Sequence, residues 1–363
     1  AVPQYFVSLA FRKLKNHNTM GENTKTLADL GLYGLIDYFI EQCKTLDSSA
    51  DLVDEDAFAL VKAPETISST SLFLEGINFD LVYTPLQHLG YKAITASVNN
   101  ILAMNAKPSQ LALSLGISNK LTLQMLELLM RGVFEACKDY GITLSSFKPT
   151  TSLTGLTIAT TLTGMPYATG SVTRSGANDT DVICVTGDLG GALLGLHLLE
   201  REKRVLKSND VSQPDFGNND YVLRRQLKPE ARISIIAKLN ELGITPTAMT
   251  GISEGLATSL ILMCRASKKG CRIYENKVPL NQASLKAAAE LNFNPLIAAL
   301  NGGEDYELLF TLPLKVYEAA ADSLPQNITA IGYITEPEKA CRMITATDDE
   351  TDLKAPGWGK EYH

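Results

Sequence analysis

Two kinds of apolar pattern alternate in the first half of this 363-residue chain. Three segments have the period of an amphipathic helix, namely 27–39, 86–104 and 121–138. The last of these ends before Gly141, a residue type that often follows a helix. Two β-prone runs, 66–74 and 155–164, separate the helical segments and predict strands.

The second half alternates strand and helix more regularly. Strands are predicted at 181–186, 271–274 and 306–312, and helices at 190–203, 229–242 and 253–267. Pro229 would then occupy the first turn of its helix. Because Pro166 and Gly170 interrupt the pattern between the halves, we place a domain boundary there. A chain of this length holds about two domains, which we expect at 24–165 and 166–363.

The first residues differ from the rest. Residues 1–19 contain Arg12, Lys13 and Lys15 but no acid, and Met20 follows. A signal peptide carries its basic residues before its apolar region, whereas here they come after it. We therefore interpret residues 1–23 as an extension outside the fold.

Composition excludes several classes of protein. The net charge of −7 argues against sequence-independent nucleic-acid binding, which needs a basic surface. No apolar run is long enough to span a membrane. Six cysteines without a C-x-x-C pair indicate reduced, mostly buried thiols of a cytoplasmic protein rather than a disulfide framework or a zinc site. With four histidines, a His-rich metal site is also not expected.

Eight short runs carry a family resemblance. They are LEGINFDL (74–81), GYKA (90–93), AMNAKP (103–108), RSGAND (174–179), TGDLGGALLGL (186–196), RQLKPEAR (225–232), PTAM (246–249) and NGGEDYELLFTLPL (301–314). In this order and spacing they resemble the thiamine-monophosphate kinase family over about residues 24–363. That family is related to aminoimidazole-ribotide synthetase, selenide water dikinase and a hydrogenase-maturation protein. The Cys and Lys pair expected near the start of a selenide water dikinase is not seen here.

The resemblance implies a fold and a reaction. The fold would be two α/β domains, and the N-terminal sheet would form a shared barrel in a homodimer. The reaction would transfer the γ-phosphoryl group of ATP to thiamine monophosphate, giving thiamine diphosphate. Two polyphosphates held close together repel each other, and the family cancels this repulsion with several Mg²⁺ ions bound by carboxylates from separate loops.

The metal-binding positions depart from the family pattern. The resemblance places them at Glu55, Asp56, Ser69, Thr70, Ser71, Asn100, Lys148, Gly251 and Glu254. The family has an acid at seven of these positions, and the acids are replaced here by Ser71, Asn100, Lys148 and Gly251. One unit-charge contact at about 4 Å is worth about 4 kcal/mol at an effective dielectric constant of 20. We therefore predict that a Mg²⁺ cluster no longer binds at millimolar concentration.

Lys148 suggests a replacement for the metal. A lysine ammonium is a fixed cation, and it could lie between Asp56 and Glu254, which would otherwise repel each other. The alternative is that Lys148 points into solvent beside Pro149 and has no such role.

The remaining ligand positions are mixed. The resemblance implies ATP contacts at Arg174 and Ser253 and substrate contacts at Asn78, Glu304 and Trp358. Each has a structural alternative: an ion pair for Arg174, a capping acid for Glu304, C-terminal packing for Trp358. The glycines of TGDLGG could present N–H groups to an anion or could serve tight packing.

Three functions stay open at this point. The chain could be a weakly active kinase that uses fewer Mg²⁺ ions, or a silent module that binds ATP, thiamine monophosphate or another small phosphate ligand. It could also be a dimerisation partner of an active paralogue. We expect lost or much reduced Mg²⁺-dependent catalysis.

Overall fold

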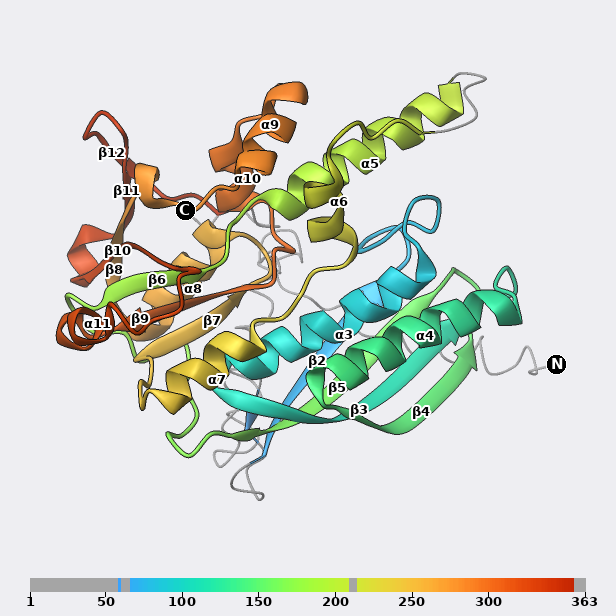
Figure 1. The fold of residues 1–363 in the computed structure, drawn as a ribbon, viewed down its shortest axis with the longest axis horizontal. Helices are drawn as coiled ribbons and strands as arrows, with labels where there is room; N and C mark the ends of the chain where they lie inside the picture. The colour runs from blue at the N-terminus through green and yellow to red at the C-terminus, as the bar shows by residue number, and fades with distance from the viewer. Residues whose placement is uncertain (1–57, 60–65, 209–213, 356–363) are drawn as a thin grey trace, which may run out of the picture.

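The computed structural model describes residues 58–59, 66–208 and 214–355 and contains two β-sheets with helices packed on them (Figure 1). The predicted helix at 27–39, the extension 1–23 and the candidate site residues Glu55, Asp56 and Trp358 lie outside the described residues. A mixed α/β fold is confirmed. The division at residue 165 stays a prediction. No described helix is both long and apolar enough to cross a membrane.

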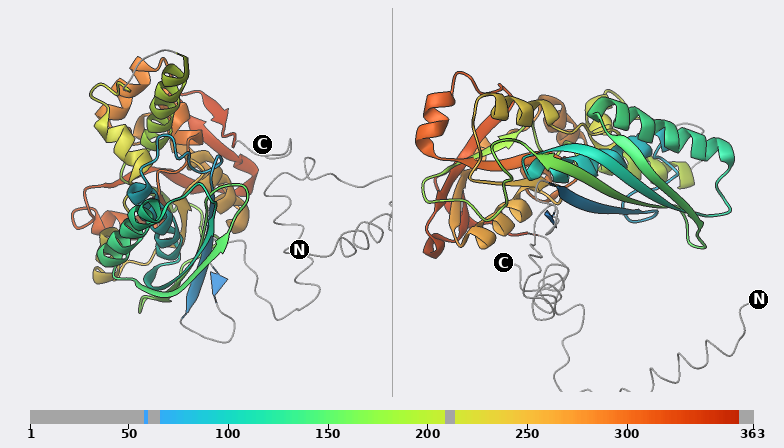
Figure 2. Two further views of the ribbon diagram at one scale, coloured as in Figure 1. Left: turned by 90° about the vertical axis from the view of Figure 1, so that its right-hand side faces the viewer. Right: turned by 90° about the horizontal axis from the view of Figure 1, so that it is seen from below.

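The N-terminal sheet has the strand order β1-β2-β5-β3-β4. Its strands are β1 (Phe58–Ala59), β2 (Ile67–Leu74), β3 (Ala106–Ile117), β4 (Thr143–Thr151) and β5 (Thr157–Pro166). The helices α3 (Leu86–Ala103) and α4 (Leu123–Tyr140) cover one face (Figure 2). Both helices and the strands β2 and β5 agree with the sequence prediction. The sequence prediction misses β3 and β4. The strand β4 is a polar edge strand without an apolar alternation.

The two faces of this sheet differ. In β5 the residues Ile158, Thr160 and Leu162 are buried beneath the helices, and their neighbours along the strand are only partly buried. On the opposite face Leu72 and Met165 have 54% and 55% of their surface exposed. No described helix covers this second face (Figure 2).

The C-terminal sheet has the order β12-β11-β8-β10-β6-β9-β7. Its strands are β6 (Val182–Thr186), β7 (Ala248–Ile252), β8 (Gly270–Tyr274), β9 (Glu307–Leu312), β10 (Ile328–Thr335), β11 (Cys341–Ile344) and β12 (Glu350–Asp352). The helices are α5 (Gly191–Ser208), α6 (Asp220–Leu227), α7 (Ile233–Glu241), α8 (Leu256–Ser267), α9 (Gln282–Glu290), α10 (Pro295–Asn301) and α11 (Leu314–Ala320). Two 3₁₀ turns span Glu275–Lys277 and Pro337–Lys339.

Two predicted helix starts are wrong. The helix α7 begins at Ile233, so Pro229 lies before it rather than in its first turn, and its carbonyl accepts a hydrogen bond from the Thr95 hydroxyl. The helix α8 begins at Leu256 rather than at residue 253, because Gly255 has a φ of 97°, which is not helical.

One apolar core joins the two sheets. Helix α3 lies between them (Figure 1), and most of its surface is buried. Its residues Ile94 and Ile101 belong to the same buried cluster as Leu111 of β3, Met249 of β7 and Phe310 of β9. Helix α3 therefore contributes to the cores of both halves of the molecule.

The helices α3 and α4 cross at two glycines. A Cβ on Gly132 would lie 1.8 Å from the carbonyl oxygen of Gln87, and one on Gly90 would lie 2.1 Å from that of Leu129. Each contact is with backbone, so a side chain there must push the helices apart.

We expect Gly132→Ala to lower the free energy of unfolding by about 1–3 kcal/mol through overpacking. Urea denaturation measures the change. Arg131→Ala, on the exposed face of the same helix, is the control and should change stability by less than about 0.5 kcal/mol. Equal stability of Gly132→Ala and the native protein would contradict the close crossing.

Candidate active site

A buried ion pair connects the two halves of the chain. Lys92 of α3 is 3% exposed, and its Nζ lies 2.8 Å from Oε2 of Glu304. The same carboxylate oxygen accepts a hydrogen bond of 3.0 Å from Nε2 of Gln226, on α6. Glu304, a predicted substrate-binding residue, thus meets side chains from two separate helices.

The turn that carries Glu304 has an unusual backbone. Glu304 and Tyr306 have φ values of 58° and 50°, in the left-handed region that side chains other than glycine seldom adopt. The Glu304 amide donates to the Ser253 carbonyl (2.7 Å), and a Cβ on Gly303 would lie 2.7 Å from that same oxygen. This tight contact places Ser253 and Glu254 beside Glu304, so three predicted site residues come together. Such backbone strain is typical of functional sites.

Asp305 organises the start of α5. It is fully buried and accepts hydrogen bonds from the amides of Gly190 (2.7 Å) and Ala192 (3.1 Å). Arg225 approaches it at 3.5 Å. The glycine-rich start of α5 therefore directs these two amides to a carboxylate of the protein itself. Burial raises the pKa of Asp305 to about 6, although Arg225 and the two amides oppose the shift.

Glu307 completes a buried charge cluster. Its carboxylate contacts the guanidinium groups of Arg225 (3.0 Å) and Arg232 and accepts a hydrogen bond from the Thr186 hydroxyl (2.6 Å). No pattern in the sequence predicts a role for Lys92, Arg225, Asp305 or Glu307. The only signal for them was their position within the runs GYKA, RQLKPEAR and NGGEDYELLFTLPL.

Hydroxyl and amide groups occupy the described part of the predicted metal-binding positions between α3 and β2. Asn100 Nδ2 donates to the Ser69 hydroxyl (3.0 Å), and the hydroxyls of Ser97 and Thr160 are 2.6 Å apart. Thr160 Oγ1 also donates to the carbonyl of Ser71 at 3.5 Å. The described members of this network are uncharged, and the predicted residues Ser69, Ser71 and Asn100 are close together in it. Thr70, also predicted, is exposed and lies 3.4 Å from the Thr161 hydroxyl, through Oγ1 of both residues.

Strand register separates Lys148 from this network. Lys148 pairs with Ser114, which pairs with Ala159, and all three face the uncovered side of the sheet. Ser71 pairs with Thr160 and so faces the helices. Lys148 is exposed and forms no ion pair with any described residue. The described residues therefore give no support to Lys148 as the counter-ion of Glu254.

The other predicted ligand residues have local structural contacts. Asn78 Oδ1 accepts from the Leu74 amide at 2.9 Å and closes the turn after β2. Arg174 is 7% exposed, and its carbonyl accepts from the Ser267 hydroxyl at 3.0 Å. Gly251 is buried in β7, where its carbonyl accepts from the Ser259 hydroxyl.

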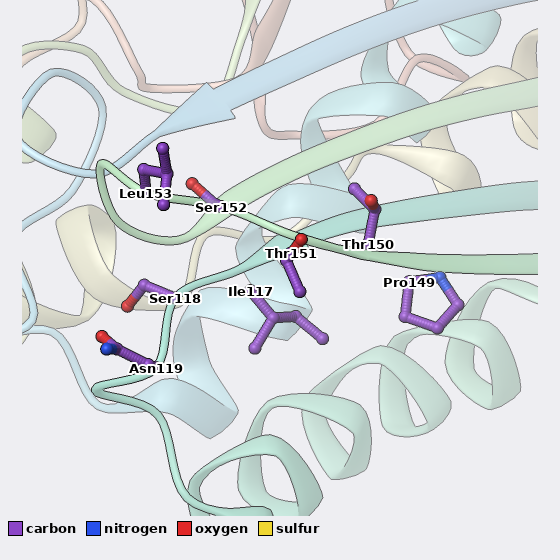
Figure 3. Close-up of a pocket in the computed structure, with 8 residues that line it drawn as sticks. All are labelled: Ile117, Ser118, Asn119, Pro149, Thr150, Thr151, Ser152 and Leu153. Atoms are coloured by element: carbon purple, nitrogen blue, oxygen red, sulfur yellow. The ribbon is translucent and has the colours of Figure 1, made fainter. Parts of the chain in front are cut away.

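A surface pocket of about 670 Å³ lies elsewhere, where β3 and β4 end (Figure 3). Its lining side chains are all uncharged: Ile117, Ser118, Asn119, Pro149, Thr150, Thr151, Ser152 and Leu153. None of these side chains is a cation, so the pocket supplies no counter-charge for a polyphosphate.

Comparisons with known proteins decide the family. A family model described as the N-terminal domain of AIR synthase related protein matches residues 54–187. The thiamine-monophosphate kinase of Bacillus subtilis (strain 168) is 30% identical over 309 residues, which cover 83% of this chain and 90% of that protein. This chain belongs to the thiamine-monophosphate kinase family. The resemblance inferred from the sequence runs is thereby confirmed.

Solved structures agree with the family. One described as AaThiL complexed with AMPPCP and TMP has a TM-score of 0.78 and 25% identity, and covers 93% of this chain and 99% of its own. A hydrogenase maturation protein, HypE, has a TM-score of 0.64 at 19% identity, covers 86% of this chain and 94% of its own, and shares the fold.

The described part of the site does not fit the family's Mg²⁺ cluster. Of the metal-binding positions that the structure describes, only Glu254 has a carboxylate, and it is exposed. Among residues 66–208 and 214–355, no three carboxylates have oxygens close enough together to hold one ion. A hard divalent cation needs several oxygen ligands, usually with carboxylates among them.

The Lys92–Glu304 pair predicts an asymmetry in stability. We expect Glu304→Gln to cost about 3 kcal/mol, because it leaves a buried ammonium without a counter-charge. Lys92→Met should cost less, since Glu304 is 25% exposed and keeps its hydrogen bond from Gln226. Chemical denaturation of both variants tests this order. The exposed pair Lys238–Glu241 is the control, and Glu241→Gln should cost less than about 1 kcal/mol. A larger loss of stability for Lys92→Met than for Glu304→Gln would contradict the assignment of Lys92 as the more deeply buried charge of the pair.

Asp305 predicts a pH dependence. Its pKa of about 6 exceeds the ordinary value of 3.8, so the folded state binds more protons between these values than the unfolded state. The stability that Asp305 contributes is therefore complete below about pH 4 and is lost as the pH rises through 6. In urea unfolding at several pH values, Asp305→Asn should remove this slope, while exposed Asp322→Asn should keep it. Parallel profiles for the native protein and Asp305→Asn would contradict the burial argument.

Proposed function

We propose that this chain binds the phosphate ligands of the thiamine-monophosphate kinase family, ATP and thiamine monophosphate, but that its Mg²⁺-dependent phosphoryl transfer is lost or much reduced. The single observation that carries the proposal is that the side chains of Ser69, Ser71 and Asn100 are uncharged, at positions where the family resemblance places metal ligands. The complex of AaThiL with AMPPCP and TMP supports the choice of ligands.

We assign ligand roles by position in the family. Arg174 and Ser253 would contact ATP, and Asn78, Glu304 and Trp358 would contact the substrate. The contact of the 303–304 turn with Ser253 supports this arrangement, because it joins one residue of each group. The family's Mg²⁺ would normally neutralise phosphate charge during transfer. Of the family's acidic metal ligands, only Glu55, Asp56 and Glu254 would be left to hold Mg²⁺.

We also propose a cytoplasmic homodimer of two-unit chains, with boundaries at 24–165 and 166–363. The uncovered face of the N-terminal sheet supports it, since Leu72, Leu74 and Met165 expose apolar surface there. An exposed apolar patch of this kind is typical of an interaction surface. The same face could instead bind an active paralogue. Size measurements of the chain alone and mixed with such a paralogue distinguish the homodimer from the mixed complex.

Calorimetry and a phosphoryl-transfer assay test the proposal together. We expect ATP to bind with little dependence on Mg²⁺ and thiamine monophosphate to bind after it. Turnover at saturating Mg²⁺ should be at least about 100-fold below that of the Bacillus subtilis relative measured alongside, since metal ions supply several kcal/mol of transition-state stabilisation.

A gain-of-charge variant is the matched test. Ser71→Asp combined with Asn100→Asp should introduce a Mg²⁺ dependence of ATP binding that the native chain lacks. Kinase activity of the native chain at the level of the relative, or an unchanged metal response of the variant, would overturn the proposal.

A further inference from the structure

Three cysteines far apart in the sequence meet in the C-terminal sheet. Cys264 lies in the last turn of α8, Cys271 in β8 and Cys341 at the start of β11. Their sulfur atoms all lie within 4.8 Å of one another. The candidate active site uses none of them. The absence of a C-x-x-C pair argued against such a cluster, but the fold assembles it from three separate elements.

The backbone fixes the cluster closely. Lys268 has a φ of 53°, and the Lys269 amide donates to the Cys264 carbonyl at 2.8 Å, so the chain turns directly from α8 into β8. Cys341 and Cys271 are direct partners in the parallel pairing of β11 with β8. A Cβ on Gly270 would lie 2.5 Å from the Ala340 carbonyl, which shows how closely the two strands approach.

The donor set selects a class of cation. Among the described residues no histidine or carboxylate joins the three thiols. Thiolates prefer soft cations, such as Cu(I) and Zn²⁺, over Mg²⁺, Ca²⁺ or Mn²⁺. Metal–sulfur bonds of about 2.3 Å separate the sulfurs of a three-coordinate site by about 4 Å, which is compatible with the observed cluster.

The surroundings also favour binding. Cys264 and Cys271 are buried in an apolar cluster, whereas Cys341 is half-buried and gives access from the surface. Metal binding would displace the thiol protons of the ligand cysteines, as it does at other thiolate sites.

We propose that Cys264, Cys271 and Cys341 together bind one soft monovalent cation of the Cu(I) type through three sulfur ligands. Zn²⁺ is less suitable because structural zinc sites are almost always four-coordinate, and the described residues offer three ligands. A disulfide would use two of the sulfurs and leave the third without a role. The bound ion would join α8, β8 and β11 at one point.

Alkylation of the native chain tests the site without any substitution. The reduced protein is treated anaerobically with one equivalent of Cu(I), then with N-ethylmaleimide during partial unfolding, and each cysteine is quantified by mass spectrometry. We expect Cu(I) to protect Cys264, Cys271 and Cys341 and to leave Cys137 and Cys184 unaffected. Equal labelling of all five with and without Cu(I) would overturn the proposal.

Competition with a chromophoric Cu(I) chelator gives the affinity. The starting protein carries Cys43→Ser, Cys137→Ser and Cys184→Ser, so that the cluster holds its only thiols. Cys341→Ser should weaken binding by about 100-fold or more, since even residues that only orient a ligand contribute 10- to 100-fold. X-ray absorption should find three sulfur neighbours at about 2.3 Å.

Three results would contradict the proposed three-sulfur Cu(I) site. Unchanged affinity in Cys341→Ser, fewer than three sulfur neighbours, or tighter binding of Zn²⁺ than of Cu(I) in parallel titrations would each refute the assignment. If Cys341→Ser does not fold, Cys341→Ala and the alkylation pattern of the native chain provide the same decision.

Discussion

A buried ammonium group requires a carboxylate, and that requirement connects the two halves of this protein. Lys92 is almost inaccessible to solvent on α3, so the turn that carries Glu304 must remain against that helix. The amide of Glu304 in this turn donates a hydrogen bond to the Ser253 carbonyl. The next residue, Asp305, accepts a hydrogen bond from the Gly190 amide at the start of α5. The positions of Glu304 and Ser253 therefore depend on this buried charge pair between the two halves.

Periodicity predicted several long elements, such as α3 and β2, but it missed the twelve-residue strand β3 and short or polar strands. The edge strand β4 has polar residues on both faces, and β11 and β12 are too short to show a period. The site residues came from the family resemblance, which could not show their contacts. Lys92 and Glu304 are 212 positions apart, and only the folded chain brings them together.

The two candidate metal sites differ in the chemistry of their ligand atoms. Between α3 and β2 the described residues at the predicted metal positions are uncharged, and hydrogen bonds such as that of Asn100 with Ser69 connect the helix and the strand. In the C-terminal sheet, three cysteine sulfur atoms lie close together although no short sequence motif connects them. A hard cation needs anionic oxygens, whereas a soft one needs polarisable sulfur.

The core that α3 shares with both sheets restricts how this family can exchange parts. A genetic crossover at the predicted boundary near residue 165 would combine an α3 from one ancestor with β7 and β9 from another. Ile94 and Ile101 would then pack against side chains of a different size and shape from Met249 and Phe310. Protein interiors are packed at crystal density and tolerate such mismatches poorly. Recombination between relatives at this point should therefore be selected against, and the two units should descend together.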